Sequence, residues 1–386
     1  MTWENKINQK LKTNKNNILV RNINVTTYYS PCYIQVLGKN YCNFSSNDYL
    51  NLSHDSRIIN AWKKGAEIYG VGSGGSSYMS GYTTAHEQLE TRLADWLGYT
   101  KSILFISGFS ANQAVISTLL NKEDIIFADK KSHASIIETC VQNSAALYRF
   151  KHNSIEDLNQ LNINLNTKNK LKLIITEGVF SMDGDMAPLK LLNKFSEKPT
   201  RMLLVDDAHG IGVIGKNGKG SCDYQNIKPH ILMITFGKAF GISGAAVLCN
   251  NTIYKYLRQF SKHLICSTAM PPAQAYTLLK SLDIIQTDKS IRDKLNENIN
   301  YFCSQAKHLS FQLLSSRTAI QPIIIGNNEQ TILLSNKLKK DGIWTNAIRS
   351  PTVPIGTERL RITINAMHSK KDINKLLEKL HEYNNK

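Results

Sequence analysis

Short runs of hydrophobic residues recur along the chain up to about residue 249, and stretches of mixed polarity long enough for helices separate most of them. Runs in which nearly every position is Ile, Leu or Val are typical of strands that are buried on both faces. Such strands with helices between them form a mostly parallel sheet. The pattern therefore indicates an α/β fold with helices on both faces of the sheet, and we predict strands at residues 102–107, 124–129, 171–178, 201–207, 231–236 and 244–249.

One of the intervening stretches, residues 83–99, reads TTAHEQLETRLADWLGY. Its leucines recur at every fourth position, which places them on one side of a helix. Thr84 followed by Glu87 has the spacing of a capping box, and Gly98 suits the residue that closes a helix. We therefore predict a helix that begins near Thr84 and ends before Gly98.

The pattern changes after about residue 285 to long polar helices, predicted at 289–309 and 329–342, with short strands at 319–326 and 359–364. This alternation is typical of a small α+β domain. The residues before the first strong pattern resemble an extended arm. We predict an N-terminal arm at 1–45, a large α/β domain at 46–285 and a small C-terminal α+β domain at 286–386.

The composition, with 42% hydrophobic and 20% charged residues among 386, is that of a globular protein. No hydrophobic run approaches the roughly 18 residues that span a bilayer. The opening residues, MTWENKINQKLKTNKNN, lack the apolar core of a signal peptide. We therefore expect a cytoplasmic protein that does not bind a membrane.

The seven cysteines form no CxxC pair and have no histidine at zinc spacing, so reduced thiols and no metal site are predicted. The net charge of +17 could indicate a nucleic-acid-binding protein. However, the lysines are spread along the chain and no nucleic-acid-binding motif is present. We expect no nucleic-acid partner, while an anionic small substrate fits the charge.

Polar side chains follow five of the predicted strands. Ligands bind beyond the carboxyl ends of strands in an open parallel sheet, because loops and helix N-termini meet there. Taken singly, a histidine in such a loop is more often an ordinary hydrogen-bonding residue, an aspartate is more often a helix cap, and a lysine is more often solvated. Their convergence on one sheet edge favours a functional site, and the residues concerned are Ser107, Gly108, Phe109, His133, Ser181, Asp185, Asp206, His209, Thr235 and Lys238.

Lys238 follows the strand predicted at 231–236 and lies among Gly237, Ala239 and Gly241. Small neighbours leave room for a flat cofactor, and a lysine whose charge is disfavoured forms Schiff bases with carbonyl groups. Pyridoxal phosphate needs a lysine, an acid near its ring nitrogen and a phosphate cup. Asp206 can supply the acid, and the cup can come from Ser107, Gly108, Phe109 and Thr235.

Several motifs in order carry a resemblance to a known family. They read SSNDYL, GSGGSSYMSGYTTAHEQLE, FISGFSANQAV, SHASIIE, TEGVFSMDGDMAPL, VDDAHGIGVIG, TFGKAFGISGAAV, STAMPPAQA and GTERLRITINAMH. The chain resembles the α-oxoamine synthases, pyridoxal-phosphate enzymes of the aminotransferase type I fold, over nearly its whole length. The resemblance implies a homodimer that condenses an amino acid with an acyl thioester and releases CO2. Within the family, the likeness is to members that use L-alanine and a pimeloyl group carried on coenzyme A or on a carrier protein.

The resemblance also implies roles for individual residues. Lys238 would hold the cofactor as a Schiff base, Asp206 would pair with the ring nitrogen, and His209 would reach the ring hydroxyl. His133 would stack on the ring and contact the acyl substrate, and Ser181 would bind near the ring oxygen. The phosphate would be held by Ser107, Gly108, Phe109 and Thr235, with Ser267 and Thr268 reaching the phosphate of a neighbouring subunit. The substrates would be bound by Arg361, which takes the amino-acid carboxylate, and by Arg21, Asn47, Arg349 and Thr352 on the acyl side.

Two alternatives stay open on the sequence. The first is a sister activity on the same scaffold, glycine C-acetyltransferase or 5-aminolevulinate synthase, because the pocket that tells a methyl group from a hydrogen cannot be identified from sequence. The second is a basic nucleic-acid-binding protein on an inactive enzyme fold. Visible absorbance of a bound cofactor would separate the second from the first.

Overall fold

A computed structural model describes residues 1–16, 22–165 and 169–384, and it divides into two units. Unit 1 comprises Met1–Ser46, Met182–Gly184 and Lys294–Lys386, and unit 2 comprises Asn47–Ser181 and Asp185–Asp293. This division differs from the predicted one in two ways. The N-terminal segment belongs to the same unit as the C-terminal residues, and the large unit ends at residue 293 rather than 285.

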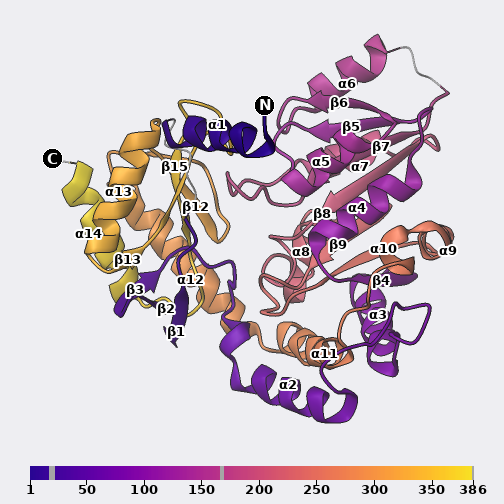
Figure 1. The fold of residues 1–386 in the computed structure, drawn as a ribbon, viewed down its shortest axis with the longest axis horizontal. Helices are drawn as coiled ribbons and strands as arrows, with labels where there is room; N and C mark the ends of the chain where they lie inside the picture. Colours follow the sequence, from indigo (N-terminus) through magenta and orange to yellow (C-terminus); the bar gives the residue numbers. More distant parts are fainter. Residues whose placement is uncertain (17–21, 166–168, 385–386) are drawn as a thin grey trace. The chain divides into compact units, whose positions relative to one another are not determined.

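A seven-stranded sheet forms the centre of unit 2 (Figure 1). Five adjacent strands are parallel, and only β10 runs antiparallel to its two neighbours. The predicted α/β class with a mostly parallel sheet is therefore confirmed. The strands, in the order β4-β10-β9-β8-β7-β5-β6, are β4 (Lys101–Phe105), β10 (Ala245–Cys249), β9 (Ile231–Thr235), β8 (Arg201–Asp206), β7 (Lys172–Glu177), β5 (Ile125–Asp129) and β6 (Ala146–Phe150).

The sheet is buried because helices cover it. Alternate strand residues such as Ile126, Leu173 and Val247 pack in one hydrophobic cluster with Val115 of α4 and Ile136 of α5. The intervening strand positions are buried as well, which is why the strands appear as unbroken hydrophobic runs. The helices of unit 2 are α2 (Ser56–Tyr69), α3 (Thr84–Leu97), α4 (Gly108–Leu119), α5 (Ala134–Gln142), α6 (Ile155–Asn164), α7 (Leu189–Phe195), α8 (Gly220–Tyr224), α9 (Asn251–Phe260), α10 (Lys262–Ile265) and α11 (Pro272–Thr287), with short 3-10 turns at Leu52–His54 and Lys216–Gly218.

The predicted helix at 83–99 is present as α3, with one correction at its start. The N-cap is Thr83 rather than Thr84, and the ring Nδ1 of His86, not the Glu87 carboxylate, accepts the Thr83 backbone N–H at 3.1 Å. Gly98 closes the helix with a φ of 72°, a left-handed conformation that glycine adopts without strain.

Unit 1 contains two four-stranded sheets. The first has the order β1-β2-β3-β13 and the second the order β11-β12-β15-β14. Residues 26–43 of the predicted N-terminal arm therefore contribute three strands to the first sheet. The strands are β1 (Thr26–Ser30), β2 (Tyr33–Val36), β3 (Lys39–Asn43), β11 (Gln312–Leu313), β12 (Ile320–Ile324), β13 (Ile343–Trp344), β14 (Asn346–Ile348) and β15 (Arg359–Thr363), and the helices are α1 (Trp3–Asn16), α12 (Lys289–Ala306, which begins in unit 2), α13 (Asn328–Lys340) and α14 (Lys370–Asn384).

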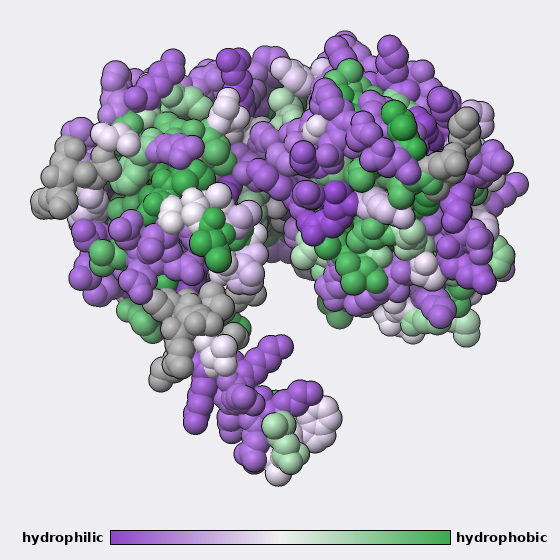
Figure 2. Space-filling view, turned by 90° about the horizontal axis from the view of Figure 1, so that it is seen from above, coloured by the Kyte–Doolittle hydropathy of each residue, from purple (hydrophilic) through white to green (hydrophobic). Residues whose placement is uncertain are grey.

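Hydrophilic side chains predominate on the face shown in Figure 2, interrupted by smaller hydrophobic patches. Among the described residues, no helix combines the length and apolar character that crossing a bilayer requires.

Candidate active site

A pocket in unit 2, here called the Lys238 pocket, lies where β5, β7, β8 and β9 end. It is open to solvent. Seven of the residues predicted for the cofactor line it: Gly108, Phe109, His133, Asp206, His209, Thr235 and Lys238. Five residues that were not predicted join them: Asn112, Ser135, Glu177, Ala208 and Met233.

Asp206 is the last residue of β8 and is only 4% exposed. Its Oδ1 accepts the backbone N–H of Ala208 at 3.0 Å, and its Oδ2 accepts the side-chain amide of Asn112 at 2.8 Å. The same Asn112 amide donates to Ser135 Oγ at 3.0 Å, which links α4 to α5 beneath the pocket. The carboxylate is therefore fixed in one orientation before any ligand binds.

His133 is the N-cap of α5, and its Nδ1 accepts the backbone N–H of Ser135 at 3.2 Å. Burial lowers the pKa of this imidazole, and the nearby Lys238 lowers it further, although Asp206 acts in the opposite direction. A ring nitrogen that accepts from a backbone N–H carries no proton, so His133 presents a neutral ring to the pocket.

His209 lies on the turn that follows β8 and is 6% exposed. Its Nδ1 is 2.6 Å from the hydroxyl of Tyr49, which also lies 3.4 Å from Oδ1 of Asn47. Asn47 was predicted on the substrate side. Tyr49 contacts both Asn47 and His209, so Asn47 is linked through Tyr49 to a residue that lines the pocket.

The turn from β4 into α4 provides backbone donors. Ser107 is the N-cap of α4, and its Oγ accepts the Ser110 backbone N–H at 3.1 Å. Gly108 and Phe109 occupy the first helical turn, where backbone N–H groups have no partner within the helix. A Cβ at Gly108 would lie 3.6 Å from Thr235 Oγ1, so this helix start and Thr235 form one side of the pocket. Such a start attracts phosphate groups.

Glu177, the last residue of β7, is the main residue that the sequence did not reveal. It is 3% exposed, lines the pocket, and pairs in register with Asp206 of β8. Its Oε1 has no hydrogen-bond partner among the described residues. Burial, with the charge of Asp206 adding to it, raises the pKa of this carboxyl well above its usual range, although Lys238 and the backbone N–H groups of His133 and Ser181 act in the opposite direction. Burial therefore favours the protonated, neutral form of this carboxyl.

Glu177→Gln is expected to raise the thermal stability of the protein at pH 8 and to leave it nearly unchanged at pH 4.5. A carboxyl whose folded-state pKa is raised loses stability as pH rises above its unfolded value, by about 1.4 kcal/mol for each pH unit up to the folded pKa. The neutral amide removes that penalty. Each kcal/mol of added stability corresponds to about 2–4 °C in Tm. Thermal unfolding of both proteins from pH 4.5 to 9 measures the effect, and a pH-independent difference would contradict a neutral Glu177.

Asp207, next to Asp206, is fully buried and points away from the pocket. The backbone N–H of Ser221 donates to its Oδ2 at 2.8 Å, and the Ser221 hydroxyl donates to its Oδ1. Burial raises the pKa of Asp207 to about 7. Three glycines enclose this carboxyl group, because a Cβ at any of them would lie within 1.9 to 2.2 Å of its oxygens: Gly178, Gly210 and Gly220.

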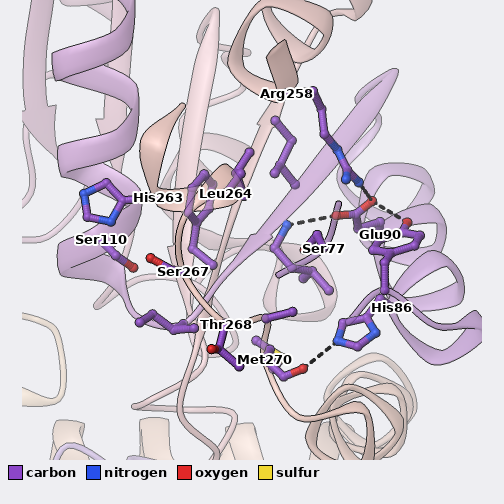
Figure 3. Close-up of a pocket in the computed structure, with 16 residues that line it drawn as sticks. Ser77, His86, Glu90, Ser110, Arg258, His263, Leu264, Ser267, Thr268 and Met270 are labelled. Atoms are coloured by element: carbon purple, nitrogen blue, oxygen red, sulfur yellow. Dashed lines mark hydrogen bonds and ion pairs between the residues drawn. The ribbon is translucent and has the colours of Figure 1, made fainter. Parts of the chain in front are cut away.

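The other predicted cofactor residues lie elsewhere. Ser181 is 8% exposed, in the hairpin after β7, and does not line the pocket. Ser267 and Thr268 line a second cavity of unit 2, where Figure 3 shows them with Ser110 and His263. Their predicted approach to the phosphate of a second subunit stays a prediction.

Three predicted substrate residues belong to unit 1. Arg361 lies in β15, is 8% exposed, and donates from Nη1 to Thr363 Oγ1 at 3.1 Å. The backbone N–H of Thr352 donates to the carbonyl of Arg349 at 2.9 Å. Their approach to a substrate stays a prediction, and Arg21 lies outside the described residues.

The fold and the pocket are those of a pyridoxal-phosphate-dependent enzyme of the aminotransferase type. The family described as aminotransferase class I and II matches residues 39–380, and the chain belongs to this family.

Two relatives match over almost the whole chain. A protein of Buchnera aphidicola subsp. Baizongia pistaciae (strain Bp) named 8-amino-7-oxononanoate synthase is 54% identical over 382 residues, 99% of each chain. A protein of the same name from Yersinia pseudotuberculosis serotype O:1b (strain IP 31758) is 48% identical over 381 residues, again 99% of each chain.

Solved structures agree with the fold. Serine palmitoyltransferase from S. paucimobilis, solved with bound PLP and myriocin, has a TM-score of 0.93 and 29% identity, covering 99% of this chain and 98% of its own. The 8-amino-7-oxononanoate synthase of Francisella tularensis has a TM-score of 0.77 and 34% identity, covering 89% of this chain and 97% of its own. The resemblance to the α-oxoamine synthases is therefore confirmed.

Proposed function

We propose that this protein catalyses the 8-amino-7-oxononanoate synthase reaction. L-Alanine and a pimeloyl thioester are condensed to 8-amino-7-oxononanoate, with release of CO2 and the free thiol, an early step of biotin biosynthesis. The observation that carries the proposal is the Lys238 pocket, in which a lysine, an oriented aspartate, a neutral histidine and a helix start converge. Full-length identity to relatives of that name supports it.

The cofactor is pyridoxal phosphate, and the donor set of the pocket fits it. Lys238 offers an amine and Asp206 an acceptor already oriented by Asn112. The start of α4 offers backbone N–H groups at Gly108 and Phe109 for a phosphate. Oε1 of Glu177 and Oδ1 of Asn112 have no hydrogen-bond partner in the part of the chain that the structure describes, and a bound group or water can satisfy them.

When bound, pyridoxal phosphate supplies an aldehyde that condenses with amines and a ring that withdraws electrons from the amino-acid Cα. Lys238 Nζ would hold the cofactor, and its amine, when free, would take the proton from the amino-acid Cα and return one. Asp206 keeps a proton at the ring nitrogen favourable by its charge. Positioning such a proton-transfer group commonly contributes about 10²–10⁴-fold to the rate.

The remaining residues bind and orient. His133 presents the face of a neutral imidazole to the ring, and His209 and Ser181 bind near the ring hydroxyl. Thr235, Ser107 and the start of α4 hold the phosphate. Arg361 takes the alanine carboxylate, for which a guanidinium offers two parallel donors. Asn47, Arg349, Thr352 and Arg21 bind on the acyl side.

A homodimer completes the site in this proposal, with Ser267 and Thr268 of one subunit reaching the phosphate held by the other. Ile106, which lines the second cavity, is 50% exposed, and Phe109, which lines the Lys238 pocket, is 39% exposed. The net charge of +17 suits an acyl carrier with phosphate or acidic groups, whether coenzyme A or a carrier protein.

Assays that pair alanine or glycine with pimeloyl, acetyl and succinyl thioesters test the proposal. We expect kcat/KM to be highest with alanine and a pimeloyl thioester. A single methyl group contributes about 1–3 kcal/mol, so the preference for alanine over glycine is expected to be about 10- to 200-fold. Preference for glycine with acetyl or succinyl thioesters would instead assign glycine C-acetyltransferase or 5-aminolevulinate synthase activity. A protein without visible cofactor absorbance whose DNA affinity falls steeply with salt would favour nucleic-acid binding.

A further inference from the structure

His152 lies just beyond β6, and both of its ring nitrogens face carboxylates. Nδ1 is 2.9 Å from Oδ1 of Asp129, and Nε2 is 2.8 Å from Oδ2 of Asp185. Since a carboxylate accepts hydrogen bonds and does not donate them, both nitrogens must carry a proton, and the ring is an imidazolium. The side chains of His152, Asp129 and Asp185 are 17%, 0% and 31% exposed. In this arrangement, here called the His152 bracket, the contact with Asp129 is therefore buried and the contact with Asp185 is partly exposed to water.

One arm of the bracket reaches the turn that carries His133. Asp129 ends β5, and its Oδ1 also accepts the backbone N–H of Lys131 at 2.8 Å. Its carbonyl accepts the backbone N–H of Ser132 at 3.1 Å. These contacts shape the turn that leads directly to His133, the N-cap of α5 in the Lys238 pocket.

The other arm reaches the hairpin that carries Ser181. The carbonyl of Asp185 accepts the Phe180 backbone N–H at 2.9 Å, which closes the hairpin around Ser181. Asn153 reinforces both arms, because its backbone N–H donates to Asp129 Oδ2 at 2.8 Å and its side-chain amide donates to Asp185 Oδ2 at 2.9 Å. The Phe180 ring packs edge-on against His152, with centroids 4.4 Å apart.

We propose that His152 is a positioning residue whose imidazolium fastens the His133 turn and the Ser181 hairpin to each other. His152 does not line the pocket, so it acts through these two loops and not on the substrate. Neutral side chains cannot replace it fully, because the ring must donate to two carboxylates in opposite directions. The expected changes in hydrogen exchange depend only on the contacts of the bracket, while the expected loss of cofactor affinity rests on the proposed function.

The charge state of the bracket agrees with this role. Burial alone would lower the pKa of His152, but hydrogen bonds and attraction from Asp129 and Asp185 outweigh it and raise the pKa to about 9. These two carboxylates, from the end of β5 and from the hairpin, are the charged groups that act on the ring. A raised histidine pKa stabilises the fold fully below the unfolded value of about 6.5, and this stabilisation is lost as pH rises through about 9.

Hydrogen exchange at neutral pH tests the proposal without any turnover. In His152→Gln, exchange of backbone amides in residues 130–135 and 179–186 is expected to quicken relative to the rest of unit 2. The matched control is His230→Gln. His230 is also a part-buried histidine of unit 2, and its Nδ1 accepts the Leu203 backbone N–H at 3.2 Å, with no carboxylate contact among the described residues. Unchanged exchange in both loops, or equal changes in the control, would overturn the proposal.

Cofactor binding and pH profiles give independent measurements. Titration of the apoprotein with pyridoxal phosphate is expected to show about tenfold weaker binding for His152→Gln, since residues that orient ligand-binding side chains commonly contribute about 10–100-fold. Between pH 7 and 10, the wild type is expected to lose thermal stability more steeply than His152→Gln. A parallel loss in both proteins, or wild-type cofactor affinity in the variant, would count against the bracket.

Asp185→Asn serves as the second variant, because its side chain is 31% exposed and its loss is less costly to folding. Its amide oxygen still accepts from His152 but carries no charge, which weakens this arm alone, so exchange is expected to quicken in 179–186 and not in 130–135. Quickening in both segments, or in neither, would contradict the two-arm arrangement. If the exchange pattern is as expected but no synthase activity is found, the proposed function fails while the positioning role stands.

Discussion

Lys238→Ala is expected to abolish turnover while leaving the fold intact. The side chain lines an open pocket, so its truncation leaves no closed cavity in the core, and the residual rate should be at least about 10²–10⁴-fold below wild type because both the covalent anchor and the proton-transfer amine are lost. Steady-state assays and thermal unfolding measure the two effects separately.

Borohydride reduction provides the direct readout for this lysine. Wild-type protein should retain the cofactor after reduction and denaturation, with the added mass on the peptide that contains Lys238, whereas Lys238→Ala should retain none. Lys216→Ala, at an exposed lysine of the same unit, is the control and should behave as wild type. Covalent retention by Lys238→Ala would place the attachment on another residue.

Asp206→Asn is expected to bind pyridoxal phosphate covalently but to lose about 10²–10⁴-fold in kcat. The amide preserves the size of the side chain and removes its charge, and its NH2 group cannot accept one of the two hydrogen bonds that Ala208 and Asn112 now donate to the two carboxylate oxygens. The ring nitrogen then lacks a partner that stabilises its proton. Reduction should still label Lys238, which separates loss of chemistry from loss of binding.

Asp95→Asn, at an exposed position on α3, is the matched control and should leave kcat unchanged. Wild-type turnover in Asp206→Asn would remove Asp206 from the proposed mechanism. An equal fall in kcat and in covalent labelling would mean that Asp206 only shapes the pocket.

The sequence revealed most of the sheet because its central strands are buried on both faces. All six predicted strands are present, but β6 was missed. It lies at the edge of the sheet, where all of its residues except Phe150 are exposed or partly buried, so ALYRF has no continuous hydrophobic run. In α3, the helix was predicted correctly and its first residue was not, because two neighbouring threonines are equally plausible caps and only the position of His86 decides between them.

Site residues such as Lys238 and Asp206 could be predicted, because their residue type and their position at the end of a strand together indicate their role. Residues that act through distant partners could not be found this way. Tyr49 contacts His209 across 160 positions of the chain, and Asn112 reaches Asp206 across 94. Glu177 was overlooked because it lies within the run predicted as a strand at 171–178, and only the tertiary structure shows that it is buried beside Asp206.

The enclosure of Asp207 limits how this enzyme can be redesigned. A library that randomises loops near the pocket to admit new substrates would yield few folded members if it varied positions 178, 210 and 220. Even alanine there would drive a methyl group into the Asp207 carboxylate oxygens. Such a library should therefore vary residues that line the Lys238 pocket and leave these three glycines unchanged.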